Sequence, residues 1–229
     1  MLAAGLWALF AASSLVVGAF VAQHFALSKQ VVGQTMGFGA GALIAALAYE
    51  LIPNDNVSDI QVWLSFGAGA LVFYAADSWL DRRTSGGAPG QTIALGALLD
   101  GVPESIVLGM SLAVGGSVSV GFLVAVLVSN IPESLSSTAD MLATRSAAAI
   151  YRLWISIAIV SGVAGALGYA IAEAVSASDG RYVQAFAAGA VLTMLADSMM
   201  PEAFEEGGKR VALLTALGFA VAAVLTTLD

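Results

Sequence analysis

Two short motifs near the middle of the chain carry the side chains best suited to chemistry. One is residues 100–104 (Asp-Gly-Val-Pro-Glu), and the other is residues 129–133 (Ser-Asn-Ile-Pro-Glu). Each motif lies inside a long apolar stretch, where an ionisable side chain is costly and usually functional. On a helix, each proline also leaves the carbonyl four residues earlier without its usual backbone donor. Together the motifs would offer carboxylate, amide, hydroxyl and carbonyl oxygens, which are donors for a cation.

The spacing within each motif brings its polar residues to one side of a helix. We therefore predict a metal site from five residues: Asp100, Glu104, Ser129, Asn130 and Glu133. The sequence has no lysine or arginine at a comparable depth to neutralise these acids. Crowded carboxylates in a low-dielectric setting hold either protons or a cation. The alternative is therefore that Glu104 and Glu133 stay protonated and hydrogen-bond across the helices.

Further acids lie nearer one end of their apolar segments: Asp77, Asp140, Asp197 and Glu202. Asp140 follows Glu133 by two helical turns on the same face. We interpret Asp77, Asp140 and Asp197 as a possible exit path for the cation; the alternative is that they are ordinary interfacial acids in water. Glu50, near the opposite end of its segment, is a secondary candidate for the entrance.

The composition places these motifs in a membrane. Of 229 residues, 59% are hydrophobic and 10% are charged, and the mean hydropathy is +0.90. Apolar runs of about 20 residues are typical of spanning helices. We expect one transmembrane domain over residues 1–229. The absence of cysteine excludes disulfides and thiolate ligands, and the net charge of −8 argues against a nucleic-acid partner.

Hydropathy and the polar breaks predict an all-α protein with eight spans. The expected spans are residues 2–23, 31–52, 61–80, 91–114, 118–141, 147–172, 181–204 and 209–228. Seven of the eight basic residues fall beside loops that follow odd-numbered spans: Lys29, Arg82, Arg83, Arg145, Arg152, Lys209 and Arg210. Basic loops stay cytoplasmic. Both termini should therefore be extracytoplasmic, in the plasma (inner) membrane.

Two internal similarities predict inverted repeats. The Pro-Glu-Ser triplet of the fourth span recurs in the fifth, which runs the opposite way. Residues 38–53 also match residues 186–201 without a gap, including Phe38 with Phe186 and Gly41 with Gly189. In transporters, such repeats meet at a substrate site near the bilayer midplane.

At these residues the chain resembles the ZIP family (Zrt-/Irt-like proteins), which are divalent metal transporters with eight spans. The resemblance covers nearly the whole chain and includes both external termini and the paired Pro-Glu motifs. Members carry His-Asn-x-Pro-Glu on the fourth span and a His- or Gln-led version on the fifth. By position, Asp100 replaces the first histidine, Gly101 replaces the asparagine, and Ser129 takes the leading position of the fifth span.

The resemblance implies a 3+2+3 arrangement of helices, a homodimer, and an elevator-like movement of spans one, four, five and six. The transported substrate would be zinc. However, both leading positions here hold oxygen donors, and the sixth span has no acid. Oxygen ligands suit harder ions, so manganese or ferrous iron is the second expectation, and the number of bound ions stays open.

Two other classes of protein remain as alternatives. An intramembrane aspartyl or metal-dependent hydrolase could use Asp77, Asp100 and Asp197, but its Gly-x-Gly-Asp and His-Glu-x-x-His signatures are missing from the sequence. A metal-binding membrane protein without transport activity is the other. We therefore expect a transporter, not an enzyme, with a divalent cation and the lipid bilayer as partners and no cofactor.

Overall fold

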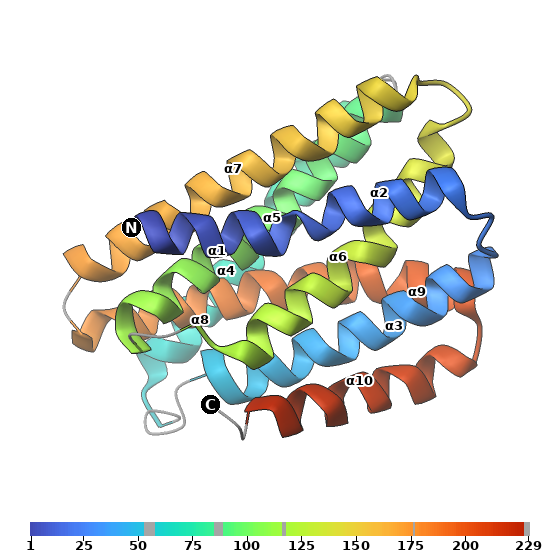
Figure 1. The fold of residues 1–229 in the computed structure, drawn as a ribbon. Coiled ribbons are helices and arrows are strands. Elements are labelled where there is room, and N and C mark those ends of the chain that lie inside the picture. Colours follow the sequence, from blue (N-terminus) through green and yellow to red (C-terminus); the bar gives the residue numbers. More distant parts are fainter. Residues whose placement is uncertain (53–57, 85–88, 116–117, 176, 227–229) are drawn as a thin grey trace.

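The computed structural model describes residues 1–229 except 53–57, 85–88, 116–117, 176 and 227–229. The described residues form helices and no strand (Figure 1). In chain order these are α1 (Leu2–Ala12), α2 (Ser14–His24), α3 (Lys29–Ala46), the π-helix η1 (Leu47–Leu51), α4 (Ile60–Thr84), α5 (Pro89–Gly115), α6 (Val120–Met141), α7 (Ala147–Ala174), α8 (Ala177–Met194), the π-helix η3 (Leu195–Met199), α9 (Met200–Gly207) and α10 (Arg210–Thr226).

These helices follow the eight predicted spans. Within the described residues, seven continuous helical segments are long and apolar enough to cross a membrane, and α10 is a shorter apolar helix. Serines set several of the helix starts: Ser119 accepts a hydrogen bond from the Phe122 amide at 3.1 Å, and Ser28 caps α3 in the same way. The all-helical, membrane-embedded class is therefore confirmed.

The outer surface of the bundle is apolar, as a lipid environment requires. On α7, Ile159 and Val163 are exposed, and on α10 Leu213 is 75% exposed. Water-soluble monomers rarely expose continuous apolar surface of this kind. The helices therefore pack on one another through part of their circumference and face hydrocarbon with the rest.

The first predicted span is divided, because residues 2–23 form two helices. α1 ends at Ala12 and α2 begins at Ser14. The hydroxyl of Ser13 donates to the Phe10 carbonyl at 2.6 Å, and that of Ser14 donates to the Ala11 carbonyl at 2.5 Å. Such local side-chain bonds compete with the helical ladder and often bend helices.

The start of α1 and the end of α10 lie at the same end of the bundle (Figure 1). The α2–α3, α6–α7 and α9–α10 connections lie at the opposite end. We call these the terminal end and the opposite end. The side of the membrane on which the two termini lie stays a prediction.

The two segments matched in sequence also share an irregularity of structure. They run in opposite directions (Figure 1). Residues 47–51 and 195–199 occupy corresponding positions in the match, and both are π-helices, η1 and η3. The amide of Ile52 donates to the carbonyl of Leu47 at 3.2 Å, and Met200 donates to Leu195 in the corresponding way. π-Helices are rare and are frequent at functional sites.

Their close helix contacts also correspond. A Cβ added at Gly41 of α3 would overlap the Thr215 carbonyl of α10, and one at Gly189 of α8 would overlap the Phe66 carbonyl of α4. In return, Gly218 of α10 lies against Phe38, and Gly69 of α4 lies against Phe186. Small residues permit such close approach between membrane helices. The α3–α10 and α4–α8 pairs therefore use the same glycine packing.

Candidate metal centre

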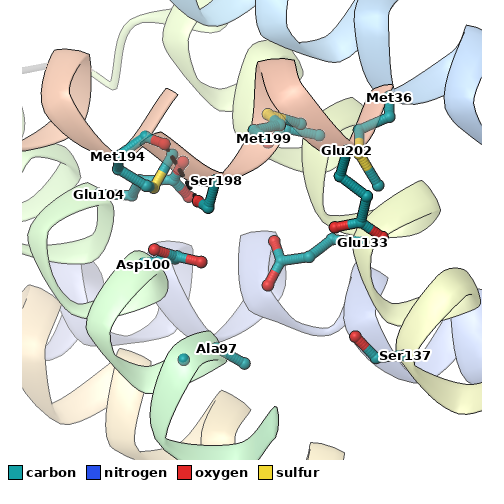
Figure 2. Close-up of a pocket in the computed structure, with 12 residues that line it drawn as sticks. Met36, Ala97, Asp100, Glu104, Glu133, Ser137, Met194, Ser198, Met199 and Glu202 are labelled. Carbon is teal, nitrogen blue, oxygen red and sulfur yellow. Dashed lines mark hydrogen bonds between the residues drawn. The ribbon is translucent and has the colours of Figure 1, made fainter. Parts of the chain in front are cut away.

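A cavity of about 140 Å³ lies between these helix pairs and the helices that carry the Pro-Glu motifs. α5, α6, α3, α8, η3 and α9 all contribute to its walls (Figure 2). Its lining residues are Met36, Gly96, Ala97, Asp100, Glu104, Ser129, Glu133, Ser137, Met194, Ser198, Met199 and Glu202. None of them is basic. The cavity is therefore acidic and sits among apolar helices.

The two motifs meet at this cavity. Asp100 and Glu104 reach it from α5, and Ser129 and Glu133 reach it from α6. Figure 2 shows the carboxyl groups of Asp100 and Glu133 on facing sides of the space. Glu104 is 4% exposed and Ser129 is 2% exposed. Four of the five predicted ligands therefore surround one space.

The prolines lie inside α5 and α6, as predicted. Because Pro103 and Pro132 have no amide hydrogen, the carbonyls of Leu99 and Val128 lose their donor four residues on. The hydroxyl of Ser134 bonds the neighbouring carbonyls of Asn130 and Ile131, at 2.9 and 3.1 Å. The Ser134 hydroxyl thus bonds to backbone carbonyls near the point where Pro132 interrupts the hydrogen bonds of α6.

Asn130 lies outside the cavity. Its side chain is buried against α1, where its amide donates to the Ala11 carbonyl at 3.4 Å. Ser129 and Asn130 are consecutive on a helix and so point about 100° apart. Asn130 therefore links α6 to α1 by a hydrogen bond. Of the residues predicted as ligands in that motif, Ser129 and Glu133 line the cavity.

The sequence reasoning missed Glu202 as a site residue. This glutamate of α9 lines the cavity beside Glu133 (Figure 2) and accepts a hydrogen bond of 2.6 Å from the Ser136 hydroxyl of α6. A signal was present, because Pro201–Glu202 repeats the Pro-Glu pair of both motifs. Its position next to a polar loop favoured the interpretation as an interfacial acid.

Three methionines form a second feature that the sequence did not indicate. Met36, Met194 and Met199 come from α3, α8 and η3 and lie on one side of the cavity, while Ala97 and Ser137 lie on the other (Figure 2). Thioethers are soft, polarisable groups. Sulfur donors therefore line the cavity together with the carboxylates.

The acids surround the space without converging on one point. Among the described residues, no group of three or more Asp, Glu, His or Cys side chains is close enough to hold one metal ion. A cavity of about 140 Å³ has room for several waters. A cation entering it would keep part of its hydration shell or draw the side chains inward.

The three acids of the predicted exit path lie away from the cavity lining. Asp140 and Asp197 are exposed, and Asp77 is half-buried on α4. However, Ser137 lines the cavity between Glu133 and Asp140 on α6. On α5, Ala97 extends the lining beyond Asp100 in the same direction. The cavity thus extends from the motifs towards the opposite end of the bundle.

Fold and site together define a membrane-embedded helical protein with an internal acidic cavity. Comparison of the chain with protein-family models and with curated proteins finds no match.

Proposed function

We propose that this protein is a divalent metal cation transporter and a member of the ZIP family. The observation that carries the proposal is the meeting of the two Pro-Glu motifs, with Glu202, around one cavity inside apolar helices. Carboxylates in such a setting are costly unless they serve an ion path or stay protonated. Because no lining residue is basic, a bound divalent cation would offset part of the negative charge of these carboxylates.

The donor set suits several divalent ions. Carboxylate and hydroxyl oxygens suit manganese and other hard ions, while thioethers favour softer ones. Zinc is bound well by carboxylates and remains the first expectation from the family resemblance. Manganese and ferrous iron follow. The metal is the transported substrate and not a resident cofactor.

We propose an inverted repeat in a 3+2+3 arrangement as the basis of transport. The paired π-helices and the corresponding glycine contacts support it. In this account, the helices α1, α2, α5, α6 and α7 move against a second group, formed by the α3–α10 and α4–α8 pairs with η1, η3 and α9, and two chains form a homodimer. The acidic cavity lies on the boundary between the two groups, where residues of both line it.

The distribution of the basic residues supports transport towards the cytoplasm. If the basic loops are cytoplasmic, the terminal end faces outward, in the plasma (inner) membrane. In that orientation the cavity extends towards the cytoplasm, which supports an inward-facing state in our proposal. Asp140, exposed beyond Ser137, marks a route on which a released ion would meet water.

The hydrolase alternative has less support from the geometry. It requires Asp77, Asp100 and Asp197 to act together, but only Asp100 lines the cavity. Uptake measurements distinguish a transporter from a metal-binding protein without transport activity.

Uptake of metal into sealed vesicles that contain the purified protein tests the proposal. We expect uptake of zinc or manganese by the parent protein and its loss in Glu104→Gln and Glu133→Gln. The matched control Glu173→Gln removes an exposed acid of α7 and should transport normally. Metal binding without uptake by the parent protein would contradict transport, and hydrolysis of a membrane substrate would favour the enzyme.

A further inference from the structure

Because η3 and η1 correspond in the sequence match, the residues of η3 that line the cavity have counterparts in η1. Ser198 and Met199 of η3 line the cavity. In the gapless match, the corresponding residues of η1 are Glu50 and Leu51. η1 thus carries a carboxylate where η3 carries a hydroxyl that lines the cavity.

Glu50 is half-buried in this structure and covered by the first turn of α6. Its Oε1 atom would lie 2.7 Å from a Cβ added at Gly121, and the Thr226 methyl of α10 adjoins the same point. Both neighbours are at the terminal end, because α6 begins and α10 ends there (Figure 1). Glu50 is therefore packed against the same helix that carries Glu133 in its middle.

At a second pair of corresponding positions, the residue of α8 is more polar than the residue of α3 that lines the cavity. Extending the match by two residues pairs Met36 of the cavity with Gln184 of α8. Gln184 is half-buried. Gln184 thus carries an amide where its cavity counterpart Met36 carries a thioether. In the same way, Glu50 carries a carboxylate where Ser198 carries a hydroxyl.

If α6 shifts against η1, as an inverted repeat implies for the other state, the surface next to Glu50 becomes the cavity wall. We infer that Glu50 is a cation-binding residue of a second vestibule, which opens at the terminal end and receives the divalent ion before Asp100, Glu104 and Glu133 do. This inference rests on the proposed function. It places at the terminal end a carboxylate that the described cavity does not use.

Kinetics of metal uptake test the role of Glu50. With metal supplied at the terminal end, Glu50→Gln should raise the half-saturating concentration by roughly tenfold. Equilibrium binding by the purified protein should stay unchanged, because the mid-membrane acids are intact. Glu173→Gln is the matched control, since it removes an exposed acid near the same end. Equal uptake kinetics for Glu50→Gln and Glu173→Gln would overturn the inference. It would also be overturned if Glu50→Gln lost equilibrium affinity for the metal by the same factor as it lost half-saturating affinity in uptake.

Thiol labelling gives a second test that needs no transport. The chain has no cysteine, so Glu50→Cys and Ser198→Cys each introduce a single thiol. A membrane-impermeant thiol reagent should reach Glu50→Cys from the terminal end only, and Ser198→Cys from the opposite end only. A Glu50→Cys thiol that stays unreactive while Ser198→Cys reacts would overturn the second vestibule. Failure of the proposed function would instead show as a parent protein without uptake.

Discussion

The hydroxyl of Ser136 on α6 donates a hydrogen bond of 2.6 Å to the carboxylate of Glu202 on α9. The bond joins a helix that carries a Pro-Glu motif to the helix that continues η3. It therefore crosses the boundary along which we propose that the two groups of helices move. On the same helix α9, Glu206 pairs with Lys29 of α3 at 3.3 Å, within one group.

Ser136→Ala removes the bond that crosses this boundary. Hydrogen bonds to charged groups contribute about 1.5–3 kcal/mol, so we expect the variant to unfold at a temperature several degrees lower. The thermal midpoint of the purified protein measures this. Ser137→Ala, which alters the cavity wall one residue along, should change it less. Equal midpoints for the two variants would mean that the Ser136–Glu202 bond does not stabilise this state.

Gly41→Ala and Gly189→Ala should destabilise the protein to a similar extent. In each case the new methyl group would overlap a backbone carbonyl of the neighbouring helix, and overpacking costs about 1–3 kcal/mol. Gly67→Ala on α4 is the control, because a Cβ there meets nothing within 4 Å. Thermal unfolding of the three variants gives the comparison. A loss at only one of Gly41 and Gly189 would argue against corresponding packing in the two helix pairs.

Imidazole donors should change the choice of metal. Asp100 and Ser129 both line the cavity, and Asp100→His with Ser129→His would replace oxygen donors by nitrogen. We expect zinc to compete better against manganese uptake in this double variant, since imidazole suits zinc. Competition assays before and after the change measure the ranking. An unchanged ranking would mean that neither residue contacts the ion.

The elements that the sequence predicts well are those fixed by long apolar runs and the polar breaks between them. The helices that fill the predicted apolar spans belong here. The meeting of Asp100 with Glu133 follows from repeated motifs in neighbouring helices. The π-helices could not be predicted, because no local composition distinguishes residues 47–51 and 195–199 from ordinary helix. They depend on tertiary packing.

The missed and misplaced site residues have geometric causes. Asn130 is one residue from Ser129, and the turn of about 100° between them directs it to Ala11. Glu202 reaches the cavity because α9 continues the line of η3, which a hydropathy pattern does not show. The methionines come from three elements far apart in the sequence, so only the packed bundle brings them together.

The central claim is that Glu104 and Glu133 bind the same cation. Metal affinity and thermal stability of purified Glu104→Gln and Glu133→Gln test it most directly, with Glu173→Gln as the control. Glutamine keeps an oxygen but loses the charge, so we expect each variant to keep its fold and to lose metal affinity. The loss should be at least about 10–100-fold, which is typical when an outer-shell partner of a metal site is changed. Variants that bind metal like the parent protein would contradict the account and favour protonated glutamates that hold the helices together.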